Sequence, residues 1–466
     1  MPLPTPIGRQ KEVLYLPAQG HIAVLGTAGS GKTTLAMLRA AYLSDVSTDH
    51  SGPTLLVTFN RALVTYLKYL ASAELANVKV EHYHKFARGY LNSRGRMGDN
   101  AIVGPDERSD LITKAIAGIR AHGSSDHPLF SKSPEFIAEE LRWISQHGIE
   151  TIEEYRATPP ELPGELNGET TLPLLWQILE EYHRQRNDAG KRYDWDDIAV
   201  AVRDELANDS RGRRYRHVII DEGQDFSPSM IQSLVRAVPA NGSVTFFGDV
   251  AQQIYGIRVS WRSAGLNLAG TPWLFEENYR NTKQIAELAL ALTKMPYYQG
   301  AADLVSPKAP KAAGPLPSLL IFPDTEQEIK FVVKQAIQLS QAGSVAILTV
   351  DHEVRRFFNS QFKAGTFTEL KNDMAKWKGG SGLSIGTYHA AKGLEFDSVI
   401  LPRLDDGRVP PPEDIQAFGE LRARADSGRL LYVGITRARQ GLILTCTGSQ
   451  TILLPSDPKI LPLLSP

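Results

Sequence analysis

Gly26-Thr-Ala-Gly-Ser-Gly31-Lys32-Thr33, or GTAGSGKT, is the stretch of sequence that decides the fold. It fits the pattern G-x-x-x-x-G-K-[ST] at every fixed position, with an apolar run (22–25) before it and a helix-forming run (34–42) after it. In this strand–loop–helix context the glycines let backbone N–H groups turn inward toward phosphate oxygens, and the helix N-terminus adds a partial positive charge. The stretch therefore predicts a nucleoside triphosphate site. A chance glycine-rich turn is the alternative, and the correct flanks on both sides disfavour it.

Two side chains of this loop have specific predicted roles. Lys32 is expected to reach the β- and γ-phosphates, and the Thr33 hydroxyl is expected to hold Mg²⁺. The loop alone predicts triphosphate binding and does not say what the energy of hydrolysis is used for.

Composition limits the class of protein. The 466 residues are enough for about two to four domains. With 51 Lys+Arg against 52 Asp+Glu the formal net charge is -1, so any nucleic-acid-binding track must be a local feature. The single cysteine, Cys446, excludes an internal disulfide and suits a reducing compartment. No stretch has the apolar length of a membrane span and the N-terminus has no signal-peptide pattern, so we expect a cytoplasmic protein with no membrane partner.

Short apolar runs that alternate with helical periodicity predict parallel α/β sheets. The expected strands are 22–25, 54–59, 218–220 and 244–247, followed by 318–322, 345–350, 383–387, 399–401 and 442–445. Between Gly89 and Lys191 the rhythm stops and the sequence reads as helical and polar. We therefore predict a first α/β domain over 1–273 that carries a helical insertion at 90–190, and a second α/β domain over 274–466.

An apolar strand ends in two adjacent carboxylates in His217-Val-Ile-Ile-Asp221-Glu222-Gly-Gln224-Asp225. After a phosphate-binding loop, this arrangement places Asp221 beside Mg²⁺ and Glu222 beside the attacking water as general base. A base is needed because water is a poor nucleophile at neutral pH. A solvated acidic turn is the alternative, and the pairing with the GTAGSGKT loop disfavours it.

Further segments, in order along the chain, resemble the motifs of UvrD/Rep-type superfamily 1 DNA helicases. Gln10 stands at the place of the Q motif, GTAGSGKTT resembles motif I, DEGQD motif II and Gly248-Asp-Val-Ala-Gln252-Gln-Ile-Tyr255-Gly-Ile257-Arg258 motif III. Asn278-Tyr279-Arg280-Asn281 resembles motif IV, Thr387-Tyr-His389-Ala-Ala-Lys392-Gly393-Leu-Glu395-Phe-Asp motif V, and Leu431-Tyr-Val-Gly-Ile-Thr-Arg437-Ala-Arg motif VI. Asp194-Trp-Asp-Asp is similar to the D-F-D-D segment of the family. One such motif is weak evidence, but the ordered set is specific.

The resemblance implies two RecA-like P-loop domains with ATP in the cleft between them. In that arrangement Tyr279 stacks on adenine, Glu395 meets the ribose, and Arg280 and Arg437 reach the γ-phosphate from the second domain, where guanidinium groups stabilise charge only when the cleft closes. The expected ATP contacts are Gln10, Gly26, Thr27, Ala28, Gly29, Ser30, Gly31, Lys32, Thr33, Thr34, Tyr279, Arg280, Gly393, Glu395 and Arg437. The expected catalytic residues are Lys32, Asp221, Glu222, Gln252, Arg280 and Arg437, and the expected Mg²⁺ ligands are Thr33 and Asp221.

The resemblance also implies a track for single-stranded DNA, on which aromatic faces accept any base. The matching residues are Phe59, Tyr83, His84, Tyr255, Arg258, Thr387 and His389. For Phe59 and Tyr83, core packing at a strand end is the alternative. The chain departs from the family where a large aromatic residue usually follows in motif III and Ile257 stands instead; Trp261 is a candidate replacement. The span between motifs IV and V is too short for most of the family's 2B domain.

We therefore predict an ATP-dependent translocase on single-stranded DNA, a 3′→5′ helicase in reduced form, with a 3′-tailed duplex as a further candidate substrate. The polarity comes from the resemblance. The alternative is a regulatory ATPase subunit that senses DNA or nucleotide and controls a nuclease or a repair or defence protein. A P-loop kinase or GTPase leaves motifs IV to VI without a role.

Overall fold

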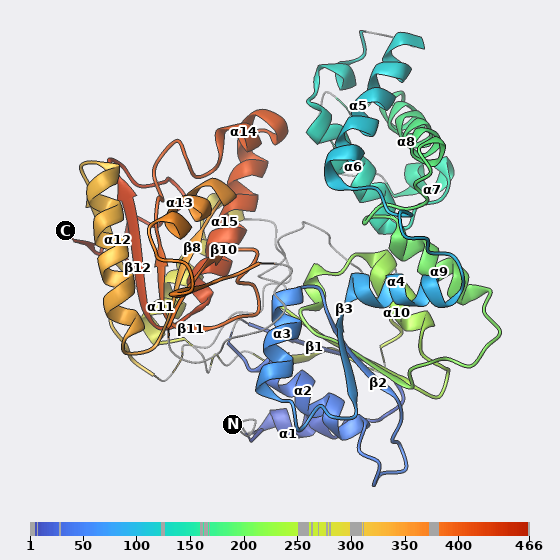
Figure 1. Cartoon of the computed structure of the whole chain (residues 1–466), viewed down its shortest axis with the longest axis horizontal. Helices are drawn as coiled ribbons and strands as arrows, with labels where there is room; N and C mark the ends of the chain where they lie inside the picture. Colours follow the sequence, from blue (N-terminus) through green and yellow to red (C-terminus); the bar gives the residue numbers. More distant parts are fainter. Residues whose placement is uncertain are drawn as a thin grey trace.

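The computed structural model describes the chain except residues 1–4, 7, 28, 123–125, 159–161, 163–165, 167, 250–260, 262–263, 269, 276–277, 279–280, 299–309, 311, 372–381 and 465–466. Two α/β lobes lie side by side, and a helical unit stands above the N-terminal lobe (Figure 1). The helical unit and the C-terminal lobe also come close to each other. Among the described residues, no helix combines the length and the apolar character needed to cross a membrane.

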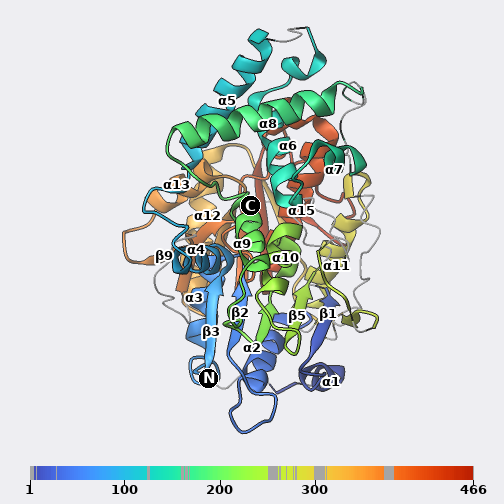
Figure 2. The same cartoon turned by 90° about the vertical axis from the view of Figure 1, so that its right-hand side faces the viewer.

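The first lobe is built on a six-stranded parallel sheet of order β3-β2-β4-β5-β1-β6. Its strands are β1 (Gly20–Gly26), β2 (Thr54–Thr58), β3 (Val78–His82), β4 (His217–Ile220), β5 (Ser243–Gly248) and β6 (Trp273–Phe275). The side view in Figure 2 shows β3, β2, β5 and β1 in this sequence across the lobe. Every residue of β2, β4 and β5 is buried, as expected for central strands covered on both faces by helices. The helices of this lobe are α1 (Arg9–Leu14), α2 (Lys32–Leu43), α3 (Arg61–Leu70), α4 (Tyr83–Ser93), α9 (Ile198–Ala207) and α10 (Pro228–Arg236), with a 3-10 turn η3 (Gly223–Asp225).

The second lobe is built on a seven-stranded parallel sheet of order β13-β7-β12-β11-β8-β10-β9. Its strands are β7 (Ser318–Phe322), β8 (Ser344–Thr349), β9 (Phe367–Glu369), β10 (Gly382–Thr387), β11 (Phe396–Leu401), β12 (Ala438–Thr447) and β13 (Leu463–Leu464). Its helices are α11 (Lys283–Thr293), α12 (Thr325–Ser340), α13 (His352–Ser360), α14 (Pro412–Phe418) and α15 (Glu420–Thr436), with a 3-10 turn η5 (Pro296–Tyr298). The predicted fold class, two parallel-sheet P-loop-type domains, is confirmed.

The boundary between the lobes differs slightly from the predicted one. Strand β6 pairs in parallel with β1, so the first sheet extends to Phe275, whereas the predicted first domain ended at residue 273. The cause is the shortness of β6, which is three residues long and gives no periodic signal.

The helical unit comprises α5 (Pro105–His122), η1 (Pro128–Ser131), α6 (Pro134–His147), α7 (Ile152–Ala157) and α8 (Thr171–Asp188). It lies within the range predicted as a helical insertion and has its own buried core, to which Leu141, Ile144 and Leu175 belong. Helix α6 has clear start and stop signals. The Ser133 hydroxyl accepts a hydrogen bond from the Phe136 N–H, and Gly148 ends the helix in the left-handed conformation with φ 68°.

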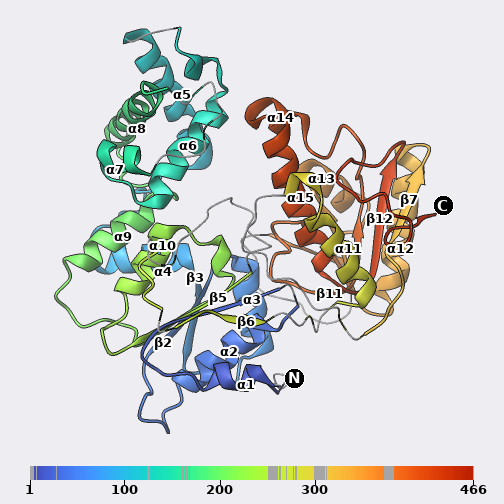
Figure 3. The same cartoon turned by 180° about the vertical axis from the view of Figure 1, so that it is seen from behind.

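The two lobes and the helical unit contact one another at specific residues. Asn60, at the start of α3, donates a hydrogen bond from its side-chain amide to the Lys392 carbonyl (3.0 Å). The second lobe also contacts the helical unit, because α14 lies beside α6 (Figure 3). Phe418 packs against the core of the helical unit, and Arg422 lies 3.8 Å from Glu139. The second lobe therefore contacts both the first lobe and the helical unit.

Candidate active site

The GTAGSGKT loop connects β1 to α2 in the first lobe. Gly29 and Gly31 have φ of 79° and 83°, in the left-handed region that side chains rarely adopt. A Cβ atom on Gly26 would lie 2.6 Å from the Ser30 Oγ, so this position also needs glycine. The local backbone therefore explains the glycines that the motif requires.

Lys32 begins α2 directly after this loop, and it is buried. Its Nζ donates hydrogen bonds to the carbonyls of Gly26 (2.9 Å) and Thr27 (2.7 Å), and lies 3.7 Å from the Asp249 carboxylate at the end of β5. Gln10 reaches the same loop, because its side-chain amide donates to the Ser30 carbonyl (3.1 Å). The structure thus brings Gln10 and the predicted loop residues together, while Ala28 lies outside the described residues.

Asp221, after β4, contacts Thr33 at the end of the GTAGSGKT stretch. The Thr33 hydroxyl donates to Asp221 Oδ1 (3.4 Å), and the buried Asp221 Oδ2 has no hydrogen-bond partner among the described residues. Burial, with a smaller contribution from the neighbouring Glu222 charge, raises the pKa of Asp221 to about 7. A buried carboxylate oxygen left without a partner, next to a hydroxyl oxygen, is a donor set suited to a hard divalent cation. These two residues therefore fit the Mg²⁺ site that the loop implies.

Glu222 follows directly and has a different electrostatic environment. Burial disfavours its charged form, but the positive charges of Lys392, Arg437 and Lys32 outweigh burial and hold the pKa of Glu222 below its ordinary value. Its backbone is left-handed (φ 53°), and its side chain accepts a hydrogen bond from the Gln224 amide (2.6 Å). Glu222 is thus kept ionised, as a general base requires.

The second lobe completes this site. Lys392 forms a buried ion pair with Asp225 of the first lobe. Arg437 is fully buried: its guanidinium donates to the carbonyls of Val433 (3.0 Å) and Leu394 (3.3 Å), and its charge acts on Glu222 across the boundary. Gly393, with φ 80°, approaches the first lobe so closely that a Cβ atom would lie 2.7 Å from Leu63. Glu395, two residues further along the chain, is partly exposed.

Some features of the site were not predicted from the sequence. Lys392 and Gln224 lie inside quoted motifs, but the motifs alone suggested no role for either. The Gln224 side chain links Glu222 to the Asp249 backbone N–H (2.9 Å), so it connects the ends of β4 and β5. Asn281 fixes the start of α11, since its side-chain amide donates to the Thr436 carbonyl (3.2 Å). The predicted residues Gln252, Tyr255, Arg258, Tyr279 and Arg280, together with Ile257, lie outside the described residues.

The predicted nucleic-acid contacts line two cavities. Phe59 and His84 line a cavity of about 580 Å³ at the junction of the first lobe, the helical unit and Phe418. Thr387 and His389 line a second cavity of about 600 Å³ on the other lobe, next to Pro411 at the start of α14. Helix α14 therefore borders both cavities.

Tyr83 is a correction to the predicted track. Its side chain is fully buried in the core of the first lobe, its ring contacts Phe226 (5.9 Å between centroids), and its hydroxyl shares a 2.7 Å hydrogen bond with Ser233. The ring has no free face for a base, so the core-packing alternative holds for Tyr83. Phe59 is only partly buried and meets His84 edge to face at 5.7 Å.

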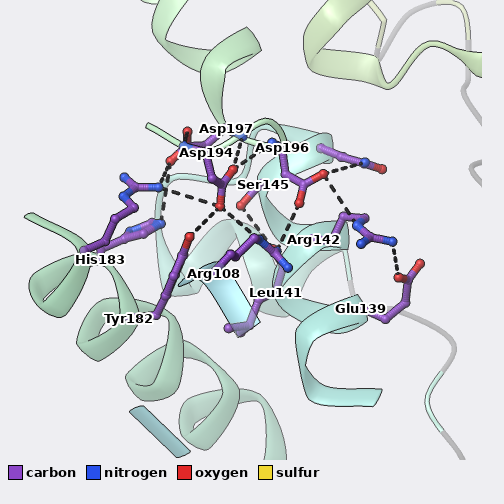
Figure 4. Close-up of polar contacts among 12 residues, drawn as sticks. Arg108, Glu139, Leu141, Arg142, Ser145, Tyr182, His183, Asp194, Asp196 and Asp197 are labelled. Carbon is purple, nitrogen blue, oxygen red and sulfur yellow. Dashed lines mark hydrogen bonds and ion pairs between the residues drawn. The ribbon is translucent and has the colours of Figure 1, made fainter. Parts of the chain in front are cut away.

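Trp195 lies in the cavity beside which Tyr83 was expected. It lines the same cavity as Phe59 and meets His84 edge to face at 5.1 Å. A network of buried charges holds its segment (Figure 4): Arg108 contacts Asp194 (3.3 Å) and Asp196 (3.0 Å), and the Tyr182 hydroxyl donates to Asp194 (2.8 Å). Helices α5 and α8 of the helical unit thus fix the loop that carries Trp195. The D-W-D-D pattern was the available signal for it.

Trp261, the candidate replacement for the missing motif III aromatic residue, packs edge to face on Phe246 at 5.1 Å and belongs to the core around the first sheet. It lines neither of the two cavities among their described residues.

A phosphate-binding loop, two carboxylates at the end of the neighbouring strand, and basic side chains from a second parallel-sheet lobe define the class of two-domain P-loop nucleoside triphosphatases. Residues 8–268 match the UvrD/REP helicase N-terminal domain, and residues 364–449 match the UvrD-like helicase C-terminal domain. The chain belongs to the UvrD/REP helicase family, and it is an ATP-hydrolysing DNA helicase.

Similarity to individual relatives is distant but extensive. The chain is 23% identical to the ATP-dependent DNA helicase UvrD2 of Mycobacterium tuberculosis, in an alignment that covers 94% of this chain and 78% of the relative. It is 39% identical to a probable DNA helicase II homolog of Rickettsia conorii over a shorter alignment of 83 residues, which covers 18% of this chain and 13% of that protein. It is 26% identical over 334 residues to the RecBCD enzyme subunit RecB of M. tuberculosis, covering 58% of this chain and 29% of the relative.

Proposed function

We propose that the protein is a single-stranded DNA translocase and 3′→5′ helicase that steps by closing and opening its two lobes. The observation that carries this proposal is the position of Glu222, which lies in the first lobe but is held ionised by Lys392 and Arg437 of the second. A base whose charge depends on the other lobe makes hydrolysis sensitive to how the lobes are arranged.

The chemistry follows from the residues in place. The loop N–H groups and Lys32 bind the phosphates, and Thr33 and Asp221 would hold Mg²⁺, which neutralises phosphate charge when bound. Glu222 takes the proton of the attacking water, while Arg437 stabilises charge that develops on the phosphoryl oxygens. Loss of the γ-phosphate removes the anion that the basic side chains share, which favours opening.

The nucleic-acid path supports movement along one strand. Phe59, His84 and Trp195 offer aromatic faces on the first lobe, and Thr387 and His389 lie on the second. If each lobe binds the strand in turn, closure of the cleft between the lobes shortens the distance between their two DNA-binding sites. Aromatic stacking is tolerant of sequence, as a translocase requires.

A streptavidin-displacement assay tests the proposal. A 3′→5′ translocase should remove streptavidin from a strand biotinylated at its 5′ end, with ATP and Mg²⁺, much faster than from one biotinylated at its 3′ end. Lys32→Ala and Arg437→Ala should each abolish displacement and DNA-stimulated hydrolysis. If the unmodified protein displaces streptavidin from neither end, the protein is not a translocase.

The similarity to a protein named as a subunit of the RecBCD enzyme favours a second candidate function, a regulatory ATPase subunit with a nuclease or a repair or defence partner. Such a subunit would hydrolyse ATP in response to DNA ends without displacing streptavidin. Purification of the natively expressed protein at its chromosomal level, followed by mass determination, distinguishes a stable assembly from the chain alone.

A further inference from the structure

A groove of about 770 Å³, here called the edge groove, runs along the outer side of the first sheet. It lies between β3, which is the edge strand, helix α4, and the segment 206–215 that leads into β4. Its cationic lining residues are Arg61, Lys79, Lys85, Arg88, Arg94, Arg211, Arg213 and Arg214, and its anionic ones are Glu81, Asp99 and Asp209. Eight positive against three negative side chains is a strong local excess in a chain whose formal net charge is -1.

Only part of this positive charge is used within the protein. Glu81 pairs with Lys79 (3.1 Å) and with Lys85 (3.3 Å), and Arg94 pairs with Glu205 (3.3 Å). Arg213 is occupied in a different way, because its guanidinium donates to backbone carbonyls, that of Leu206 among them.

Four arginines remain exposed and make no ion pair within the described part of the chain: Arg61, Arg88, Arg211 and Arg214. Arg214 lies over the ring of Tyr215 at 5.5 Å, which fixes the direction of its side chain. Exposed guanidinium groups that are not neutralised by carboxylates suit phosphate groups, to which they donate two parallel hydrogen bonds.

The edge groove lies beside the cavity that Phe59, His84 and Trp195 line. Arg61 and His82 line the groove. Phe59, two residues before Arg61, and His84, two residues after His82, line the cavity of about 580 Å³ at the junction of the first lobe and the helical unit. The His82 and His84 rings lie 6.4 Å apart between centroids. The groove therefore lies next to the cavity that Phe59 and His84 line. This proximity favours the polymer proposed for the cavity as the occupant of the groove, over an acidic protein.

We propose that the edge groove binds the sugar–phosphate backbone of the DNA strand where it leaves the aromatic path over the first lobe. The proposal rests on the proposed function, because it requires a strand in that path. Arg88, Arg211 and Arg214 contact successive phosphates there and add affinity that does not depend on sequence. Short strands that fill only the aromatic path do not reach the groove.

The test compares oligothymidylates of about 8 and about 20 nucleotides by fluorescence titration, with the full chain. The triple variant Arg88→Gln/Arg211→Gln/Arg214→Gln should bind the longer strand about tenfold more weakly at 100 mM salt and keep its affinity for the shorter one. Its salt dependence on the longer strand should fall by about 2 in slope, since each phosphate that the protein neutralises on a single strand contributes about 0.7. The corresponding triple lysine variant, which keeps the charges, should recover most of the affinity.

The matched control is Lys334→Gln/Lys363→Gln/Lys459→Gln, which removes three exposed cations from the second lobe. It should bind both strands as the unmodified protein does. If the arginine variant matches this control on the longer strand, the inference is overturned and the groove is left to another acidic ligand. If neither strand stimulates ATP hydrolysis by the unmodified protein, the proposed function fails instead, so the two failures are distinguishable.

Discussion

Glu222 shows at the scale of one residue how the site sets up its chemistry. Because Lys392, Arg437 and Lys32 outweigh burial and lower its pKa, the carboxylate stays ionised at and below neutral pH. Glu222→Gln keeps the size of the side chain but removes the base, so we expect DNA-stimulated hydrolysis to fall by about 10²–10⁴ while nucleotide affinity is retained. Phosphate release and a fluorescent-nucleotide titration measure the two quantities.

The control for this substitution is Glu169→Gln, at an exposed position of the helical unit, which should leave both quantities unchanged. Protonation of Glu222 should also cause no loss of rate as the pH falls from 7 to about 5, because its lowered pKa lies below that range. Hydrolysis by Glu222→Gln at close to the control rate would assign activation of the water to another group.

Among the helices, strands and loops, the sequence predicted those that are long, buried or formed by one contiguous segment. The central strands β2, β4 and β5 are continuous apolar runs, and the loop before α2 holds its chemistry in one segment, so both were predicted. Strand β3 was missed because it carries Lys79 and Glu81 at a sheet edge, and β6, β9 and β13 because they are only two or three residues long. The role of Trp195 and the Lys392–Asp225 ion pair were missed because the residues that contact one another lie far apart in the chain. Tyr83 was assigned to the predicted DNA track because aromatic residues at strand ends occur both in hydrophobic cores and in such tracks.

Helix α6 contains a buried acid that makes the stability of the helical unit depend on pH. Burial raises the pKa of Glu140 to about 7, although its carboxylate accepts a hydrogen bond from the Tyr155 hydroxyl (3.0 Å). The unfolded value is near 4.5, so the folded state binds the proton more tightly. This contribution to stability is complete below about pH 4.5 and is lost as the pH rises through 7. Glu140→Gln should therefore stabilise the protein at pH 8, by an order of about 2–3 kcal/mol, with little effect at pH 5.

Thermal unfolding at both pH values measures this difference. Glu135→Gln is the matched substitution on the same helix; Glu135 is exposed in the first helical turn, where its charge is weakly favourable, so this variant should not raise the transition at pH 8. An equal shift at pH 5 and pH 8 for Glu140→Gln would mean that packing, and not the charge, accounts for the change.

In the proposed mechanism, hydrolysis depends on coupling between the two lobes, and substitution of the Lys392–Asp225 ion pair tests that coupling. Both side chains are almost completely buried, so removing one partner withdraws a major part of the compensation of the other charge, at a cost of up to about 3–5 kcal/mol. Lys392→Met and Asp225→Asn should each lower the stability of the protein, and the double variant should recover most of the loss. Asp188→Asn, which breaks the exposed pair with Arg184, should have no measurable effect.

Function should not recover together with stability in the double variant. Among the positive charges that lower the pKa of Glu222, that of Lys392 has the largest effect, and the double variant still lacks it. The double variant should therefore fold and bind ATP, but its hydrolysis should respond far less to single-stranded DNA than that of the unmodified protein. Denaturant unfolding and ATPase assays with and without DNA separate the two effects. Full DNA stimulation in the double variant would show that the pair only holds the lobes together, and that Arg437 alone carries the signal across the boundary.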